Sequence, residues 1–240
     1  MKKFIITVSS TIMIALIFSL IYYQNSIENT APHLNETIEQ NKQHSIPEEP
    51  KPEPLWPVTN DTISYSLQNN ELNITYNKGK DWIKVPIEKD FLFNGEYNGN
   101  EQELIDGSYV LTEDRAAFLY KQGDTLLTYS LDQGKTWQES VVSETFPAIR
   151  FRKVDFLNDL FGYVVLSGDR TMSQEFSTAF LTHDGGKTWE ETTAPPTTRL
   201  IADGGFVDET TGFMSYGTIN PEAPDLYVTH DGGNTWSESI

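Results

Sequence analysis

Short stretches of alternating apolar and polar residues fill the chain from about residue 60 onward, and turn residues separate them. Residues 154–169, which read VDFLNDLFGYVVLSGD, hold two such stretches on either side of an acidic turn. Alternation with a period of two is typical of half-buried β-strands. No segment of useful length after residue 23 has helical periodicity. The pattern predicts an all-β domain made of many short strands.

A turn motif, S/T-x-D-x-G-x-T-W, recurs within this domain. Three copies read SLDQGKTW, THDGGKTW and THDGGNTW, and a degenerate copy reads TYNKGKDW. The copies lie about 50 residues apart, close to the length of one four-stranded propeller blade. Their defining residues are Thr75, Asn77, Gly79 and Trp82; Ser130, Asp132, Gly134, Thr136 and Trp137; Thr182, Asp184, Gly186, Thr188 and Trp189; and Thr229, Asp231, Gly233, Thr235 and Trp236.

The chemistry of the motif is that of a tight turn between two strands. An aspartate side chain accepts hydrogen bonds from backbone N–H groups a few residues further on, and a glycine adopts the left-handed conformation that other residues resist. The tryptophan begins the outgoing strand and brings a large apolar face to the core. We therefore expect these residues to have structural roles.

Similarity between the copies extends upstream of the motif, where each copy offers two further alternating strands. This arrangement predicts a β-propeller of four-stranded antiparallel blades, with about four repeats over residues 55–240. The third copy holds extra residues, RTMSQEF at 170–176, which we interpret as a loop insertion because loops tolerate such variation.

These motifs resemble the Asp-box, or BNR, repeats of sialidases, of sortilin-type receptors and of bacterial propellers similar to photosystem II assembly factors. The last group is the most similar, and the resemblance implies a binding scaffold. Propellers of that group usually have six or seven blades, whereas this chain shows four repeats. It therefore forms either a compact four-bladed ring or an open array, whose free blade edge would allow self-association.

The N-terminal part of the chain differs from the repeats. Residues 4–23 carry no charge and are long enough to cross a bilayer as a helix. Lys2 and Lys3 precede this run, so the positive-inside rule places residues 1–3 in the cytoplasm and the rest outside. We interpret residues 4–23 as an uncleaved transmembrane signal-anchor at the cell membrane, with a cleaved signal peptide as the alternative. Residues 24–54 are polar and rich in proline towards their end, which predicts a disordered tether.

Charge excludes one class of partner and leaves others open. The net charge is −18, and no cluster of lysine and arginine interleaves with aromatic residues, so we expect no nucleic-acid binding. A solubilising surface explains this charge, and a site for calcium or for a basic partner protein is the alternative. The chain has no cysteine, which excludes disulfides, thiolate metal sites and lipid attachment through cysteine.

Enzyme signatures are missing from the sequence. The Arg-Ile-Pro signature that the sialidase resemblance would imply is absent, as are the motifs of other common hydrolases and nucleotide-binding proteins. His183 and His230 occupy equivalent repeat positions, and we interpret them as turn residues on separate blades. We predict no catalytic residues, no metal and no cofactor. Four arginines around the first strands of the blades are candidates for a binding patch: Arg115, Arg150, Arg152 and Arg199.

Together these observations predict a membrane-anchored, extracytoplasmic module that binds an envelope protein or a glycan. The alternative is a surface glycoside hydrolase of sialidase-like propeller fold, in which two carboxylates would act on the glycosidic bond.

Overall fold

The structure is a computed structural model that describes residues 52–96, 99–172, 174–217 and 226–239. The chain divides into two compact units, Met1–Pro50 and Lys51–Ile240. The first unit lies outside the described residues, together with the predicted cytoplasmic stub, the predicted span and all but residues 52–54 of the predicted tether. In the described part of the chain, no helix has both the length and the apolar character needed to cross a membrane.

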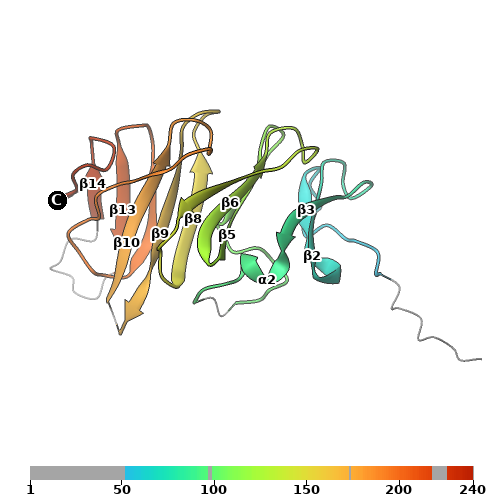
Figure 1. The fold of residues 1–240 in the computed structure, drawn as a ribbon, viewed down its shortest axis with the longest axis horizontal. Coiled ribbons are helices and arrows are strands. Elements are labelled where there is room, and N and C mark those ends of the chain that lie inside the picture. The colour runs from blue at the N-terminus through green and yellow to red at the C-terminus, as the bar shows by residue number, and fades with distance from the viewer. Residues whose placement is uncertain (1–51, 97–98, 173, 218–225, 240) are drawn as a thin grey trace, which may run out of the picture. The chain divides into compact units, whose positions relative to one another are not determined.

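Four antiparallel sheets make up the described part of the second unit (Figure 1). In chain order they contain β1 (Ser64–Ser66), β2 (Glu71–Thr75) and β3 (Ile83–Glu88); β4 (Tyr109–Leu111), β5 (Ala116–Gln122), β6 (Asp124–Ser130) and β7 (Gln138–Ser143); β8 (Ile149–Phe156), β9 (Gly162–Thr171), β10 (Gln174–Thr182) and β11 (Glu190–Glu191); and β12 (Ile201–Phe206), β13 (Gly212–Tyr216), β14 (Leu226–Thr229) and β15 (Ser237–Glu238). Within each sheet, strands that follow one another in the chain are antiparallel, hydrogen-bonded neighbours.

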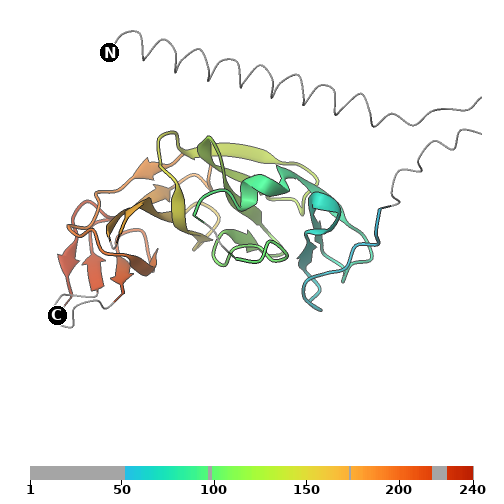
Figure 2. The same ribbon diagram turned by 90° about the horizontal axis from the view of Figure 1, so that it is seen from below.

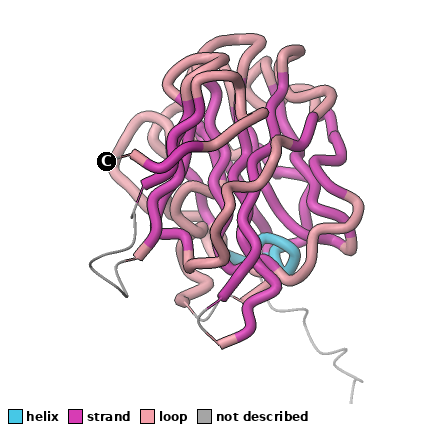
Figure 3. The backbone as a smooth tube through the Cα atoms, turned by 90° about the vertical axis from the view of Figure 1, so that its left-hand side faces the viewer, coloured by secondary structure: helices cyan, strands magenta, loops and turns pink. Residues whose placement is uncertain are grey.

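Among the described residues, helical structure is confined to short connections, as the sequence predicts for the part after residue 23. The 3-10 turn η1 (Gln68–Asn70) lies between β1 and β2, and the single-turn helix α2 (Lys89–Leu92) follows β3. Strands and loops account for nearly all of the remaining described backbone (Figure 3). The prediction of an all-β domain is therefore confirmed for the described residues.

The first sheet departs from the prediction of four strands, because it has three. Residues 53–59 run beside β1, where a first strand would lie, but only Val58 donates a backbone hydrogen bond to it, at 2.9 Å to the Tyr65 carbonyl. Pro54 and Pro57 fall in this segment, and proline has no N–H group to add to a ladder. The segment therefore covers β1 without forming a regular strand.

The third copy of the repeat corrects the interpretation of residues 170–176 as a loop. Arg170 and Thr171 extend β9, and residues 174–176 begin β10, so the extra residues lengthen this hairpin (Figure 1). A register shift between Gln174 and Phe176 accommodates the extension. Paired strands absorb the insertion because added residues on both sides of a hairpin can continue the ladder.

Each sheet has two faces, and we name the one towards the next sheet in the chain the leading face. It is formed by two residues of the strand before the turn motif and by two residues of the strand preceding that one, except that Leu67 directly follows β1. In the first three sheets these residues are apolar and at most 6% exposed: Tyr65, Leu67, Leu72 and Ile74; Ala117, Leu119, Leu127 and Tyr129; and Tyr163, Val165, Ala179 and Leu181.

Three hydrophobic cores lie between consecutive sheets. The leading face of each of the first three sheets packs on the opposite, trailing face of the next sheet, through residues such as Phe118, Val164 and Met214. Figures 1 and 2 show the sheets following one another in chain order. Among the described residues, no core cluster joins the fourth sheet to the first, so packing holds the sheets as a series of neighbours.

Candidate functional site

The turn motif closes on itself through its own side chains. In the second sheet, the Ser130 hydroxyl donates to Asp132 Oδ1 at 2.8 Å and accepts from the Gly134 N–H at 2.8 Å. Asp132 also accepts from the backbone N–H of Thr136 at 2.9 Å and from its hydroxyl at 2.7 Å. Gly134 has a φ of 82°, which favours glycine. Thr182, Asp184, Gly186 and Thr188, and likewise Thr229, Asp231, Gly233 and Thr235, repeat this network.

The degenerate first copy keeps the turn by exchanging donor and acceptor. Asn77 Oδ1 accepts from the Thr75 hydroxyl and from the Asp81 N–H, as the aspartate does elsewhere. The Asn77 amide then donates to Asp81 Oδ2 at 2.7 Å, where the other copies have a threonine hydroxyl donating to an aspartate. The two departures from the motif therefore compensate each other, and Gly79 keeps its left-handed φ of 76°.

Hydrogen bonding lowers the pKa of the motif aspartates. The Thr136 N–H, with the Thr136 and Ser130 hydroxyls, lowers the pKa of Asp132 to about 2. The Thr235 hydroxyl and N–H do the same for Asp231, also to about 2. Burial acts to raise the pKa of Asp184, but its hydrogen bonds from Thr188 outweigh this and lower it. These carboxylates are thus held ionised by the turns that they close.

The motif tryptophans reach back to the preceding sheet. Trp189 donates from its indole nitrogen to the Ser140 hydroxyl at 3.1 Å and meets the Phe156 ring edge-on, with the centroids 6.1 Å apart. Trp236 donates to the Thr193 carbonyl at 2.7 Å and packs in the same way on Phe206. Trp137 lies against the first core and Phe118. The motif thus joins one sheet to the one before it.

The candidate arginines also make contacts between sheets. Arg115, in the turn before β5, donates to the carbonyls of Gly185 at 2.9 Å and Asp159 at 3.0 Å, and its guanidinium lies 3.7 Å from the centroid of the Phe156 ring. Arg152, on β8, donates to the carbonyls of Leu92 and Asn94, and burial lowers its pKa to about 10. These two arginines connect the second and third sheets to their neighbours.

Arg150 and Arg199 lie near the start of the fourth sheet. Arg150 forms a bidentate ion pair with Glu175, with both N–O distances at 2.5 Å, and donates to the Ile201 carbonyl at 2.7 Å. The Glu175 side chain is fully buried, and its hydrogen bonds raise the pKa of Arg150. Arg199 donates to the Gly217 carbonyl at 2.5 Å. The four arginines therefore have separate partners, and their predicted role in binding stays a prediction.

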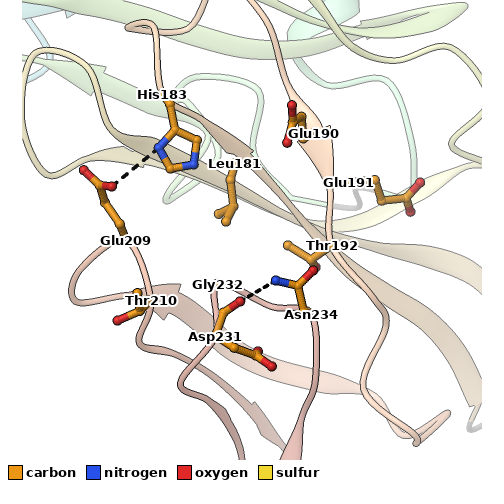
Figure 4. A pocket seen from close by; sticks show the side chains of 10 residues that line it. All are labelled: Leu181, His183, Glu190, Glu191, Thr192, Glu209, Thr210, Asp231, Gly232 and Asn234. Carbon is orange, nitrogen blue, oxygen red and sulfur yellow. Dashed lines mark hydrogen bonds and ion pairs between the residues drawn. The ribbon is translucent and has the colours of Figure 1, made fainter.

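A groove of about 270 Å³ opens between the outer parts of the third and fourth sheets (Figure 4). Its carboxylates are Glu190 and Glu191 on β11, Glu209 in the turn between β12 and β13, and Asp231 in the last turn motif. The remaining lining residues are Leu181, His183, Thr192, Thr210, Gly232 and Asn234. The lining includes neither lysine nor arginine, so a negative potential is focused in this groove.

Contacts on one side of the groove fix His183. Its Nδ1 lies 3.7 Å from Glu209 Oε2, and its ring packs on Phe161 with the centroids 5.2 Å apart. Asp231 is held by its own turn, and Asn234 donates to the Asp231 carbonyl at 2.6 Å. Figure 4 shows Glu190 and Glu191 across the groove from His183 and Glu209. Asp231 and Glu209 are thus carboxylates that already have a partner within the groove.

The sequence does not single out this groove. Glu190 and Glu191 directly follow Trp189, which is a visible local signal, but Glu209 belongs to the next repeat. Glu190, Glu191 and Glu209 line one groove only because the third and fourth sheets lie next to each other. Within the described ranges, no group of three or more histidine, cysteine, aspartate or glutamate residues is arranged to hold a metal ion.

Comparison with known proteins identifies the turn motif. The family model described as BNR/Asp-box repeat matches residues 128–139 and 180–191, which span the motifs of the second and third sheets. No curated protein matches the chain. One similar solved structure is that of the GH74 xyloglucanase from Xanthomonas campestris, at 16% identity and a TM-score of 0.42; the match covers 78% of this chain and 30% of that one. The chain therefore contains BNR/Asp-box repeats, which lie in the turns of antiparallel sheets.

Proposed function

We propose that the chain is a membrane-anchored, extracytoplasmic binding module whose acidic groove takes a basic segment of another envelope protein. The observation that carries this proposal is the groove lining, which holds Glu190 and Glu191 of the third sheet and Glu209 and Asp231 of the fourth but no lysine or arginine. A cationic peptide would replace the repulsion between these carboxylates with attraction. Complementary charge of this kind favours the encounter with a partner and selects against acidic ones.

Asp231 does not suit the role of the acid in glycoside hydrolysis. A general acid that cleaves a glycosidic bond has a raised pKa, because it must be protonated at working pH. The Thr235 hydroxyl and N–H instead lower the pKa of Asp231 to about 2. This groove residue is thus a poor proton donor.

The composition of the lining favours a peptide over a neutral glycan. Leu181 is the one large apolar residue of the groove, and no aromatic ring other than the His183 imidazole lines it. Small-molecule sites are usually lined by hydrophobic and aromatic side chains. A shallow, charged groove instead suits a flexible chain with ammonium or guanidinium groups.

Binding of a fluorescently labelled tetralysine peptide to the full-length chain in detergent tests the proposal. The double variant Glu190→Gln/Glu191→Gln removes two exposed charges, each worth about 0.5 kcal/mol, so we expect binding about fivefold weaker. The matched control Glu113→Gln/Asp114→Asn removes the same charge from an exposed turn of the second sheet. It should bind like the wild type.

Three results would contradict the proposal. Equal weakening by both double variants would mean that the peptide responds only to net charge. Turnover of a fluorogenic glycoside that Glu209→Gln abolishes would favour the glycoside hydrolase, and tight, salt-insensitive binding of a neutral oligosaccharide would favour a glycan ligand.

A further inference from the structure

His183 is a titratable side chain in a groove whose other ionisable groups are carboxyls. It lies in the turn motif of the third sheet, and its Nδ1 is 3.7 Å from Glu209 Oε2 of the fourth sheet. The side chain is 53% exposed, so water reaches it. Figure 4 shows the imidazole and the Glu209 carboxylate directed toward each other on one side of the groove. A charge gained by this imidazole is therefore a charge within the groove.

The residues around His183 are mostly acidic. Those with charged side chains in its own turn and in the elements beside it are Asp184 and Lys187; Asp159 in the turn before β9; Glu190 and Glu191 on β11; and Asp208, Glu209 and Asp231 in the fourth sheet. Hydrogen bonds from Thr210 lower the pKa of Asp208 to about 2, and those from Thr235 lower the pKa of Asp231 to about 2.

Of the residue types gathered here, histidine is the one that responds to pH near neutrality. Carboxyl groups ordinarily titrate near pH 4 and lysine near pH 10. A histidine side chain ordinarily changes its charge between about pH 8 and pH 5. A fall from about pH 7.5 to about pH 5.5 therefore adds positive charge to the groove at His183 and leaves the carboxylates ionised.

We propose that His183 makes the groove sensitive to pH, so that a basic partner is bound near neutral pH and released as the solution becomes mildly acidic. This inference rests on the proposed function and concerns the regulation of the same site. A neutral imidazole leaves the carboxylates free to attract the ammonium or guanidinium groups of the partner. A protonated imidazole competes with the partner for Glu209 and repels its cations, so both effects oppose binding.

The fourth sheet carries a matched histidine outside this setting. His230 precedes Asp231 in its turn motif, as His183 precedes Asp184. It is exposed, and it is not one of the residues that line the groove. The two histidines thus share a local sequence and differ in their relation to the carboxylates of the groove. His230 is therefore an internal control for any effect of pH on the turn motif itself.

The affinity of the full-length chain in detergent for the fluorescent tetralysine peptide, measured at pH 7.5 and at pH 5.5, tests the proposal. For the wild type we expect binding about two- to threefold weaker at pH 5.5, the effect of one added exposed charge. His183→Asn should show the same affinity at both pH values. His183→Lys carries its charge throughout this range and should bind weakly at both. The matched control His230→Asn should keep the pH response of the wild type.

The results separate this inference from the function on which it rests. Equal wild-type binding at both pH values, or a pH response that survives in His183→Asn, would overturn the inference and leave peptide binding in the groove intact. No tetralysine binding at pH 7.5, or binding that Glu190→Gln/Glu191→Gln leaves unchanged, would overturn both.

Proton release gives a second readout that does not depend on the affinity of a variant. Because a proton and a peptide that oppose each other do so reciprocally, peptide binding at about pH 6.5 should expel protons from the wild type. Calorimetry in two buffers of different ionisation enthalpy measures this release. We expect it to be lost in His183→Asn and kept in His230→Asn, and equal release from both variants would contradict the role of His183.

Discussion

The buried ion pair between Arg150 and Glu175 offers a sharp test of how the third and fourth sheets are joined. Glu175→Gln keeps the shape of the side chain and an oxygen that can accept the Ile201 N–H, which now donates to Glu175 Oε1 at 2.6 Å. It removes the negative charge and one of the two hydrogen bonds to Arg150. The Arg150 side chain is 23% exposed, and its guanidinium then lacks a counter-ion.

The expected loss follows from this geometry. Breaking a buried pair by removing one partner costs about 3 to 5 kcal/mol, and we expect the lower end, about 3 kcal/mol, because Arg150 is partly solvated and retains the Ile201 carbonyl. For a domain of this size that loss lowers Tm by about 6 to 12 °C. Thermal unfolding followed by circular dichroism measures it.

An ion pair that itself joins the third sheet to the fourth provides the control. Lys153 Nζ lies 2.8 Å from Asp203 Oδ1, with side-chain exposures of 27% and 52%. Asp203→Asn should cost about 0.5 kcal/mol, because solvent already weakens that pair. Equal effects of Glu175→Gln and Asp203→Asn would refute the reasoning. Unchanged stability with weakened ligand binding in Glu175→Gln would instead support the predicted binding role of Arg150.

Two further predictions concern the turn motif. Trp189→Ala should destabilise the chain by about 3 kcal/mol, at the lower end for such a truncation because the indole is half-buried. Trp56 is 67% exposed, so Trp56→Ala should change Tm little. Equal melting of both variants would contradict this. Acid should also destabilise the turns. The pKa of Asp132 and of Asp231 falls from an ordinary 3.8 to about 2, so their contribution is complete above about pH 4 and is lost as the pH falls towards 2. Replacing both aspartates with asparagine should flatten the dependence of Tm on pH in that range, and an unchanged slope would assign the acid sensitivity to other groups.

Local chemistry made the repeated part of the fold predictable from the sequence. The turn motif brings together residues two to four positions apart. The spacing of Ser130, Asp132 and Thr136 therefore predicts the hydrogen bonds between them. Alternation of apolar residues gave the strands that lead into the turns. The prediction of a loop at residues 170–176 is wrong because it rests on the insertion alone, whereas pairing across the hairpin decides their structure.

Contacts between sheets were beyond what the sequence could reveal. Arg115 meets Gly185, and Arg150 meets Ile201, across separations that no local pattern records. The groove likewise combines Glu190 with Glu209 from different repeats. The missing strand of the first sheet has a visible cause in Pro54 and Pro57, but only the backbone geometry shows that these residues still cover β1.

The most direct test of the account is to map where a basic ligand binds. A tetralysine peptide with a photoreactive group is crosslinked to the full-length chain, and mass spectrometry identifies the attached residues. The account predicts crosslinks on both sides of the groove, at residues 181–192 of the third sheet and at residues 209–210 and 231–234 of the fourth. Crosslinks spread over the acidic surface, or gathered away from this groove, would contradict it.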